Sequence, residues 1–502
     1  MPTDQPFATD SRRLADALRA AEFTVDPVAE RLGPQAWAAL GRNTTLAALR
    51  ALGGADDPQA TLLRLFVLQR TVGRAAADRA LPGLVDLLIA DALVEEVAGR
   101  IAATVDIRPY GADESAGIAF DGWAASDHVP GLDGRVNRTR PDFVLPPSPA
   151  SVTLTQMTIR RPVTRALDLG TGCGVQSLHL AGHAQRVVAT DLNPRALRLA
   201  DLTLRLNGVE DRVELRHGSL YEPVGDERYD LIISNPPYVM SPPQEVGERL
   251  TYREGGLPGD SLVEQVIRGA GSRLADGGSL QVLGNWAHVR GQDWTERLHD
   301  WIDPTGCDAL VLQRELLDPY EYIELWLNDA GLAGSDEYTG RYAQWLDYFD
   351  ELGIEGVGLG WMSLHNAGHA DPSVQIQEWP HSVAQPVGPA FAAQQQGVEL
   401  ARRSDEELLA TSWRLVDSVQ ETYGVPGAAD PDHIVLRQRT GFCRAVEADT
   451  ALAGVLGACD GELPLGVIIR AVAQLLEADA EGLVADLTGR IRPLVVDGFL
   501  VA

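Results

Sequence analysis

Four consecutive residues, Asn235, Pro236, Pro237 and Tyr238, carry the side chains best suited to chemistry in this sequence. They follow the apolar run Leu-Ile-Ile-Ser, so we expect them at the end of a buried strand. Proline fixes the backbone and has no N–H group, which leaves the local carbonyl groups free as acceptors. The Asn235 side-chain oxygen and the Pro236 carbonyl can each accept one hydrogen of a planar NH2 group, on which Tyr238 can stack. The motif therefore predicts a site that aims a conjugated nitrogen at an electrophile by positioning and local dipoles, without a metal.

A glycine-rich turn contains Gly170, Gly172 and Gly174 and follows a second strand-like run. Glycine lets the backbone approach a ligand closely, and such a turn holds the ligand beside a helix N-terminus, over the carboxyl ends of parallel strands. A dinucleotide fingerprint has the spacing G-x-G-x-x-G, but Val175 stands where its third glycine is needed, so NAD fits poorly. Asp168 opens the turn, and its carboxylate suits an amine or a cation better than a pyrophosphate.

Asp191 closes the next predicted strand. An acidic residue at this place can accept both hydroxyl groups of a ribose. The residues after it, Asn193 and Pro194, have a second interpretation as the N-cap and first-turn residue of a helix. The two interpretations are compatible, and the spacing from the glycine turn favours the ribose role.

The glycine turn, Asp191 and Asn-Pro-Pro-Tyr, in this order, resemble the class I S-adenosylmethionine-dependent methyltransferases. Within that class they resemble the Asn-Pro-Pro-Tyr branch, which includes the release-factor glutamine methyltransferases and the rRNA guanine and tRNA adenine amino-methyltransferases. The resemblance covers about residues 150–315. It implies S-adenosyl-L-methionine as the cofactor and no metal.

The resemblance also implies a role for each matching position. Asn235, Pro236, Pro237 and Tyr238 would be the catalytic residues that receive the target nitrogen. The family often has an acidic residue near the adenine where this chain has Ser219, so that contact would be uncharged. The cofactor would be held by Asp168, Gly170, Thr171, Gly172, Gly174, Asp191, Leu192, Ser219, Leu220 and Asn235.

Residues 252–260, Tyr-Arg-Glu-Gly-Gly-Leu-Pro-Gly-Asp, resemble the glycine-rich loop that follows the catalytic motif in the glutamine methyltransferases. They can equally be a plain loop in which Asp260 caps the next helix.

Around these motifs strands and helices alternate, which predicts an α/β fold: a seven-stranded, doubly wound, Rossmann-like methyltransferase core. The expected helices are 174–184, 194–206, 259–274, 292–302 and a pair within 318–350. The expected strands are 166–169, 186–191, 213–216, 230–234, 279–283, 309–313 and 356–361.

The length of 502 residues predicts two or three domains. We expect a helical N-terminal domain at 1–130, the methyltransferase domain at 131–380 and a helical C-terminal domain at 381–502. In the first, helices precede two β-like runs at 105–107 and 117–120, the layout of a winged helix. The last domain ends in two helices and a strand-turn-strand at 493–502, a similar layout. The polar stretch 130–149 between the first two domains looks like a linker or a crossing loop.

A formal charge of −29 disfavours binding to a phosphate backbone, although a local arginine patch can differ from the total. The four cysteines lack C-x-x-C pairing, which argues against disulfides and structural zinc and predicts a cytoplasmic location. We expect no membrane span and, from residues 1–4, no secretion signal. The candidate arginine patch consists of Arg135, Arg138, Arg140, Arg160, Arg161 and Arg165.

These observations predict an N-methyltransferase acting on an amide or amino nitrogen of a macromolecule. The charge favours a protein glutamine over an RNA base. One alternative is a small-molecule N-methyltransferase, with the flanking domains as lids or homodimer contacts. Another is a scaffold or binding protein that keeps the cofactor fold without turnover, but the intact Asn-Pro-Pro-Tyr argues against it.

Overall fold

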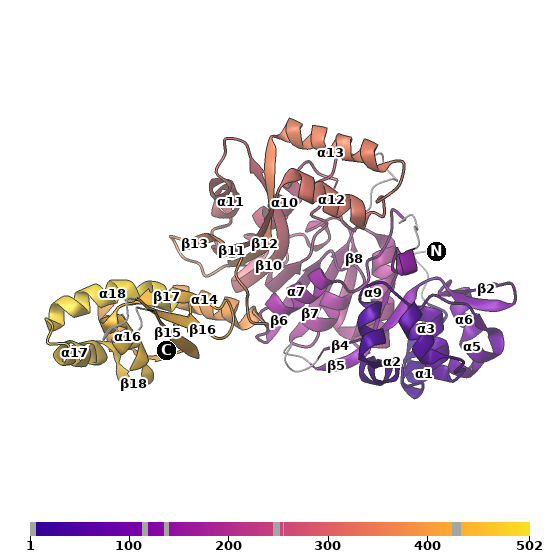
Figure 1. Cartoon of the computed structure of the whole chain (residues 1–502), viewed down its shortest axis with the longest axis horizontal. Helices are drawn as coiled ribbons and strands as arrows, with labels where there is room; N and C mark the ends of the chain where they lie inside the picture. Colours follow the sequence, from indigo (N-terminus) through magenta and orange to yellow (C-terminus); the bar gives the residue numbers. More distant parts are fainter. Residues whose placement is uncertain (1–6, 113–118, 135–139, 244–251, 255, 424–432) are drawn as a thin grey trace. The chain divides into compact units, whose positions relative to one another are not determined.

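The computed structural model describes residues 7–112, 119–134, 140–243, 252–254, 256–423 and 433–502 (Figure 1). Its internal contacts divide the chain into two compact units. The first comprises Met1–Thr155 and Arg161–Trp379, and the second comprises Gln156–Arg160 and Pro380–Ala502. The first unit contains the central sheet and all the motifs with predicted chemistry.

The central sheet has eight strands in the order β13-β11-β12-β10-β9-β6-β7-β8. Neighbouring strands are parallel, except that β12 runs antiparallel to both β10 and β11. All seven predicted strands are present, which confirms the fold class, and β13 is an additional edge strand. The strands are β6 (Val163–Leu169), β7 (Ala184–Asp191), β8 (Val213–His217), β9 (Tyr229–Ser234), β10 (Leu274–Val289), β11 (Asp308–Leu317), β12 (Ile354–His365) and β13 (Val374–Glu378).

Helices cover both faces of this sheet. The last four residues of β6 and of β9 are all buried, which requires cover on each side because successive side chains point to opposite faces. Helices α10 and α11 share a core with Leu167, Ile232 and Leu280, while α8 and α9 pack beside β7. The helices of the core are α7 (Pro149–Met157), α8 (Val175–Leu180), α9 (Pro194–Leu206), α10 (Ser261–Ala270) and α11 (Trp294–Ile302).

The predicted helix pair lies between β11 and β12, as α12 (Pro319–Asp329) and α13 (Tyr338–Leu352). Its core centres on Tyr322, which is fully buried. The Tyr322 hydroxyl accepts hydrogen bonds from the Met240 N–H (3.0 Å) and from Nδ2 of Asn285 (2.7 Å). The pair therefore supports the segment that follows Asn-Pro-Pro-Tyr.

The N-terminal part of the first unit has the element order of a winged helix. A helical segment precedes a short strand, two helices and a two-stranded ribbon, and the strands form a sheet in the order β1-β3-β2. Helices α1 to α3 come before this module. The elements are α1 (Ser11–Ala20), α2 (Val25–Leu40), α3 (Leu46–Leu52), α4 (Pro58–Leu62) with a π-helical turn (Leu63–Val67), β1 (Val72–Gly73), α5 (Arg74–Ala80), α6 (Val85–Ala90), β2 (Val94–Val97) and β3 (Arg100–Ala103).

A hairpin of β4 (Asp106–Ala112) and β5 (Phe120–Ser126) follows and packs on α9. The predicted run 105–107 overlaps the start of β4, while the run 117–120 shares only Phe120 with β5, and its residues 117 and 118 lie outside the described residues. Asn207, just after α9, binds the backbone of Trp123: its Oδ1 accepts from the Trp123 N–H (3.2 Å) and its Nδ2 donates to the Trp123 carbonyl (2.7 Å). The side chain of Asn207 thus takes the place of a neighbouring strand.

We expect Gly122→Ala to lower the free energy of unfolding by about 1–3 kcal/mol. A Cβ at Gly122 would stand 1.7 Å from Oδ1 of Asn207, and the Asn207 amide can move only by losing its bonds to Trp123. Urea denaturation measures the change. Gly54→Ala is the matched control, because no atom lies within 4 Å of a Cβ there. Equal stability of the two variants would contradict the prediction.

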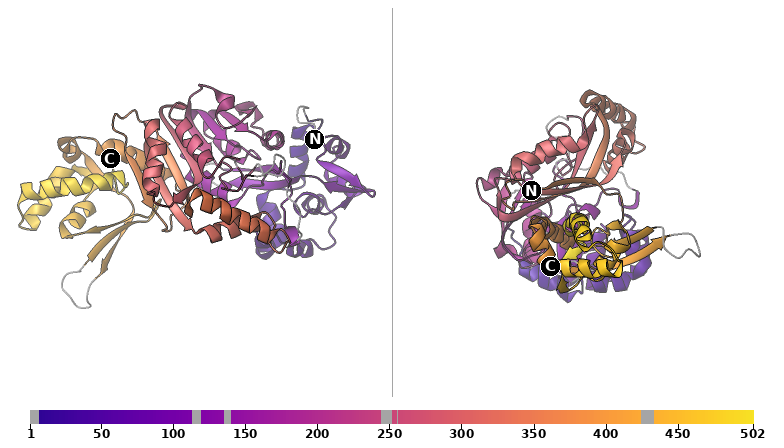
Figure 2. Two further views of the ribbon diagram at one scale, coloured as in Figure 1. Left: turned by 90° about the horizontal axis from the view of Figure 1, so that it is seen from above. Right: turned by 90° about the vertical axis from the view of Figure 1, so that its left-hand side faces the viewer.

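In its described residues the second unit combines the helices α14 to α18 with two three-stranded sheets, around a core that includes Trp413. From α16 onward its elements follow the order helix, strand, helix, helix, strand, the same order as α4, β1, α5, α6 and β2 in the first unit. Strand β14 lies between the two strands of this part in the sheet β18-β14-β19. Figure 2 shows the hairpin of β15 and β16 extending away from the helices of this unit. Its elements are α14 (Gly388–Ala401), α15 (Asp405–Ala410), β14 (Ser412–Leu415), β15 (Ser418–Tyr423), β16 (His433–Gln438), β17 (Ala445–Ala448), α16 (Thr450–Gly457), β18 (Asp460–Pro464), α17 (Leu465–Leu475), α18 (Ala480–Val496) and β19 (Leu500–Val501).

The predicted strand-turn-strand at 493–502 is wrong in its first half. Helix α18 continues through Pro493 to Val496, and only Leu500–Val501 is a strand. Leu487, Ile491, Leu494 and Val495 are all buried on the same helix, so burial of this apolar face outweighs the helix-breaking tendency of proline.

Candidate active site

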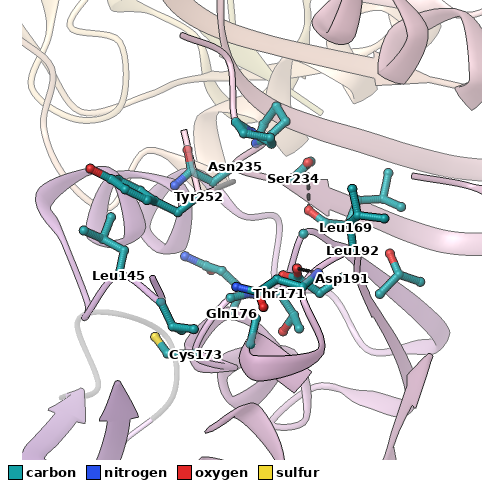
Figure 3. Close-up of a pocket in the computed structure, with 18 of the residues that line it drawn as sticks. Leu145, Leu169, Thr171, Cys173, Gln176, Asp191, Leu192, Ser234, Asn235 and Tyr252 are labelled. Carbon is teal, nitrogen blue, oxygen red and sulfur yellow. Dashed lines mark hydrogen bonds between the residues drawn. The ribbon is translucent and has the colours of Figure 1, made fainter. Parts of the chain in front are cut away.

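A cavity opens at the carboxyl ends of β6, β7 and β9 (Figure 3). Most of the residues predicted for the site line it, so the glycine turn and Asn235 share one cavity. Asp168, Gly174 and Tyr238 do not line it. The predicted residues that do are Gly170, Thr171, Gly172, Asp191, Leu192, Ser219, Leu220, Asn235, Pro236 and Pro237.

The glycine turn is held against the end of β7, where the Gly170 N–H donates to the Thr190 carbonyl at 2.9 Å. Gly174 has a φ of +85°, and a Cβ there would stand 3.0 Å from Cα of Ala200, so glycine lets α8 begin directly against α9. At Gly170 and Gly172 no atom lies within 4 Å of where a Cβ would stand. These two glycines leave the turn backbone accessible from the cavity.

Asp168 lies behind the turn and is buried. Its Oδ2 accepts hydrogen bonds from the hydroxyl groups of Thr171 and Ser177, both at 2.7 Å. Burial raises the pKa of Asp168 from 3.8 to about 6, although the two hydroxyl groups stabilise the charged form. Asp168 therefore fixes the shape of the turn from outside the cavity lining.

We expect the stability difference between Asp168→Asn and the wild type to depend on pH. The folded protein binds this proton more tightly than the unfolded chain, so the contribution of Asp168 to the free energy of unfolding falls as pH rises from 3.8 to about 6. Asparagine does not titrate. The free energy of unfolding of the variant, relative to that of the wild type, should therefore rise by on the order of 2–3 kcal/mol across that window. Urea denaturation at a series of pH values measures it, with the exposed Asp211→Asn as control. A constant difference across the window would refute the raised pKa.

Asp191 joins the end of β7 to the glycine turn. Its Oδ2 accepts from the Gly172 N–H at 2.9 Å, and its Oδ1 accepts from the Asn193 N–H at 2.8 Å. Each carboxylate oxygen keeps a further lone pair for a ligand hydroxyl group. Burial raises the pKa of Asp191, while the two N–H donors oppose that shift. Asn193 also caps α9, because its Oδ1 accepts from the Arg195 N–H at 3.0 Å.

Asn235 follows β9, whose last residue, Ser234, donates its hydroxyl hydrogen to the Leu169 carbonyl at 2.9 Å. This bond fixes the end of β9 beside the end of β6. Oδ1 of Asn235 is buried and has no hydrogen-bond partner among the described residues. A buried acceptor without a partner is costly, so this oxygen is suited to a donor that arrives with a ligand.

Tyr238 has a different place from the one predicted. Its ring packs edge-on against Trp326 of α12, with 6.3 Å between ring centroids. Its backbone forms an isolated antiparallel bridge with Glu254. Tyr252 does line the cavity, and it lies near Asn235 in Figure 3. The short bridge therefore brings Tyr252 and Glu254 to the cavity beside Asn-Pro-Pro-Tyr.

The segment 252–254 is fixed by Arg253, which is buried. Its guanidinium group contacts the carboxylates of Glu254 (3.1 Å) and of Asp329 in α12 (3.1 Å), and it donates to the Trp326 carbonyl (2.8 Å). This segment begins the loop 252–260, for which the sequence left two interpretations: the glycine-rich loop of the glutamine methyltransferases, or a plain loop in which Asp260 caps the next helix. The carboxylate of Asp260 does not cap α10; it accepts from the Ala287 N–H and pairs with Arg297.

Sequence reasoning missed one side of the cavity. Residues 143–146, Phe-Val-Leu-Pro, line it, and Phe143 contacts Tyr252 with 5.2 Å between ring centroids. They fall inside the stretch 130–149, which was interpreted as a linker or a crossing loop. The available signal was a short apolar run within otherwise polar sequence, since solvated linkers seldom carry one. We call residues 143–146 the wall segment.

Other residues with possible chemistry have structural roles. Burial raises the pKa of the Cys173 thiol to about 12, so it is a neutral thiol in the cavity lining. The described residues contain no group of three or more His, Cys, Asp or Glu side chains that could hold a metal ion. No helix in the described part of the chain is long and apolar enough to cross a membrane.

Two of the six arginines of the predicted patch have carboxylate partners. Arg140 and Arg165 form ion pairs with Asp142 and Glu227, and Arg161 donates to a backbone carbonyl. Arg135 and Arg138 lie outside the described residues.

Comparison with known proteins agrees with this arrangement. Residues 149–297 match the family model "Methyltransferase small domain", and residues 20–104 match "Domain of unknown function (DUF7059)". The ribosomal protein uL3 glutamine methyltransferase of Bradyrhizobium diazoefficiens is 35% identical over 158 residues, 30% of this chain and 50% of that protein. The release factor glutamine methyltransferase of Geobacter sulfurreducens is 33% identical over 188 residues, 34% of this chain and 65% of that protein.

The chain thus spans between half and just under two thirds of the length of these relatives. Among solved structures, one titled a putative methyltransferase from Bacillus halodurans is similar over 43% of this chain and 98% of its own, at 14% identity and a TM-score of 0.29. The family model and the two relatives confirm the predicted resemblance to the glutamine methyltransferase branch.

Proposed function

We propose that this protein is an S-adenosylmethionine-dependent N-methyltransferase whose acceptor is a planar amide or amino nitrogen of a macromolecule. One observation carries the proposal: Asn235, whose buried Oδ1 has no partner among the described residues, lines the same cavity as the glycine turn and Asp191. An acceptor for an NH2 hydrogen and a place for a nucleoside are thereby combined.

The cavity residues fit S-adenosylmethionine. Asp191 has one spare lone pair on each carboxylate oxygen for the two ribose hydroxyl groups. The backbone at Gly170 and Gly172 is open to close approach. Thr171, Leu192, Ser219 and Leu220 complete the cofactor side. When bound, the cofactor supplies an electrophilic methyl carbon on a sulfonium group.

The chain's own residues would then aim the acceptor. Oδ1 of Asn235 and the carbonyl of Pro236 each accept one hydrogen of the planar NH2 group, which directs the nitrogen lone pair toward the methyl carbon. Pro237 fixes the bend, and Tyr238 anchors it against Trp326. Tyr252 provides an aromatic face toward the cavity. Rate acceleration comes from positioning and oriented dipoles, and the residues need no metal for it.

We propose a protein glutamine as the acceptor in preference to an RNA base. The charge of −29 opposes a phosphate backbone, and within the predicted arginine patch Arg140 and Arg165 are paired with carboxylates while Arg161 is bound to a backbone carbonyl. The similar proteins are glutamine methyltransferases of ribosomal protein uL3 and of release factors. An acceptor of that kind would place the protein in the cytoplasm.

Transfer of labelled methyl from S-adenosylmethionine to cell extract tests the proposal. Extract fractions are treated with protease or with RNase after the reaction. We expect label that is lost with protease and resists RNase. Label that is lost only with RNase would show that the acceptor is an RNA base and not a protein glutamine. Label found only in small molecules would exclude a macromolecular acceptor. Cofactor binding without any transfer would favour a scaffold.

A further inference from the structure

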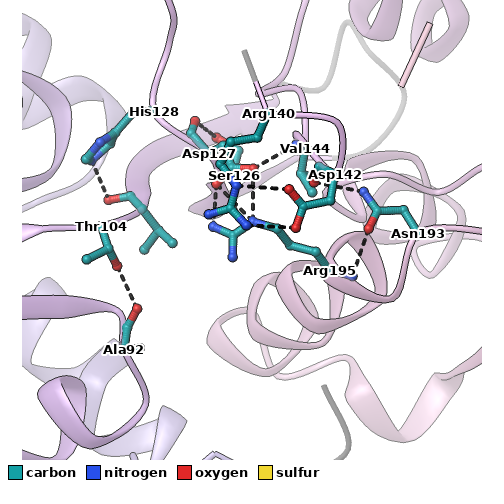
Figure 4. A network of polar contacts seen from close by, with 11 residues as sticks. Ala92, Thr104, Ser126, Asp127, His128, Arg140, Asp142, Val144, Asn193 and Arg195 are labelled. Atoms are coloured by element: carbon teal, nitrogen blue, oxygen red, sulfur yellow. Dashed lines mark hydrogen bonds and ion pairs between the residues drawn. The ribbon is translucent and has the colours of Figure 1, made fainter. Parts of the chain in front are cut away.

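A buried ion pair lies just outside the cavity, between Asp127 and Arg195 (Figure 4). Each residue is only 6% exposed. Nε of Arg195 donates to both carboxylate oxygens of Asp127, at 3.1 and 3.0 Å, and Nη2 makes a further short contact. Neither side chain lines the cavity. A buried pair of this kind is no evidence of stability by itself, because desolvation offsets the attraction, so its use must be sought in what it positions.

The pair is bonded to the wall segment. Oδ2 of Asp127 accepts from the Val144 N–H at 2.8 Å, and the Asp127 N–H donates to the Val144 carbonyl at 3.1 Å. Nδ2 of Asn193 donates to the carbonyl of Asp142, the residue before the wall segment, at 3.0 Å. Asp127 and the cap residue of α9 therefore bind this side of the cavity independently.

The same contacts continue to Asp191. Oδ1 of Asn193 accepts from the Arg195 N–H, and the Asn193 N–H donates to Oδ1 of Asp191. An unbroken series of hydrogen bonds thus runs from the wall segment, through Asp127, Arg195 and Asn193, to the carboxylate proposed to hold the ribose.

Helix α9 aligns this series with the N-terminal part of the chain. Arg195, Thr203 and Asn207 are separated by multiples of four residues, so they share one face of the helix. They bind alternate positions along β5 and its continuation: Asn207 binds Trp123, Thr203 accepts from the Ala125 N–H at 3.0 Å, and Arg195 pairs with Asp127. The matched spacing fixes the register of β5 along α9. It thereby fixes the position of Asp127 along the helix, beside the cavity.

From this geometry we infer that Asp127 and Arg195 are a positioning pair for the cofactor site: they hold the wall segment at a fixed distance from Asp191 and so set the affinity for the cofactor. The inference rests on the proposed function, because it takes the cavity to bind S-adenosylmethionine. A displaced wall segment loosens the cavity around the cofactor but leaves Asn235 and the acceptor bend in place. Disrupting the pair should therefore raise KM and Kd for the cofactor far more than it lowers kcat.

The test is a double variant, Asp127→Asn with Arg195→Met, in the full chain. Asp127→Asn alone leaves a buried guanidinium group without its countercharge and endangers folding; removing both charges avoids that penalty. Asparagine at 127 can still accept from Val144, so the change is confined to the link with α9. The matched control is Asp201→Asn with Arg205→Met, the same substitutions at an exposed pair on the same helix.

Calorimetry with S-adenosylhomocysteine gives Kd, urea denaturation gives stability, and hydrogen exchange without ligand reports on the amides of residues 142–145. We expect the double variant to keep near wild-type stability, to bind on the order of tenfold or more weakly, and to exchange the Val144 amide faster. The control should match the wild type in all three. A merely structural role predicts that affinity and stability change together, which would overturn the inference.

Unchanged affinity and unchanged exchange in the double variant would also overturn it. If the wild-type chain fails to bind S-adenosylhomocysteine, the proposed function fails. The exchange of Val144 still decides whether the pair positions the wall segment.

Discussion

Asn235→Ala is expected to lower kcat for methyl transfer by about 10²–10³-fold, the usual effect of removing one oriented dipole from an active site. The side-chain oxygen of Asn235 is buried and has no partner among the described residues. Removing this oxygen therefore breaks no hydrogen bond within the described protein. Affinity for S-adenosylmethionine should stay nearly unchanged, because Asp191 and the glycine turn hold the cofactor. Single-turnover transfer of labelled methyl, with calorimetry for the cofactor, measures both quantities.

Asn328→Ala is the control for this variant, since Asn328 is an exposed asparagine on α12 away from the cavity lining. It should retain full transfer. A large loss of cofactor affinity in Asn235→Ala, with transfer preserved at saturating cofactor, would show that Asn235 belongs to the cofactor side and that the acceptor nitrogen is held elsewhere.

Asp191→Ala should weaken cofactor binding by about 1.5–3 kcal/mol, the contribution of hydrogen bonds to a charged group. The carboxylate would accept the ribose hydroxyl groups, and it already accepts from Gly172 and Asn193. Its loss therefore also loosens the turn. Calorimetry with S-adenosylhomocysteine measures the affinity directly and does not depend on identifying the acceptor.

Asp211→Ala, which removes an exposed carboxylate before β8, serves as the matched control for charge. It should bind like the wild type. If Asp191→Ala also binds like the wild type, the ribose assignment is wrong and the carboxylate serves only to fix the turn.

The sequence predicted the central sheet well because its strands carry strong local signals. The carboxyl-terminal halves of β6, β7 and β9 are buried and mostly aliphatic, and Gly170, Asp191 and Asn235, whose roles are predicted, stand at or directly after their ends. β13 gave a weaker signal: its five residues, Val-Gln-Ile-Gln-Glu, alternate at a sheet edge, and none of them is fully buried. The extent of α18 was misjudged because a proline near its end looked like a break.

For the candidate site, the sequence predicted which motifs meet but not what encloses them. Gly170, Asp191 and Asn235 follow parallel strands, and the carboxyl ends of such strands share one edge, so their meeting in one cavity follows from the fold. The wall segment and Tyr252 are held at the cavity by contacts outside their own stretch of sequence: Asp127 and the cap of α9 bind residues 142–144, and α12 binds Tyr252 and Arg253. The pattern of a single chain does not reveal such pairings. The roles assigned to the lining residues remain predictions for the variants above.

The wall segment lies between the two stretches that family models match, residues 20–104 and 149–297. Its anchor, Asp127, follows β5, and β5 is held by Asn207 and Thr203 of the core. A chimaera that transplants only residues 149–297 into a foreign chain would therefore inherit the glycine turn and Asn235 yet lose one side of the cavity. The stretch of chain that builds the cavity is therefore longer than the stretch that contains the motifs. In chimaeras between homologues, crossovers before residue 106 should be tolerated better than crossovers between 120 and 149.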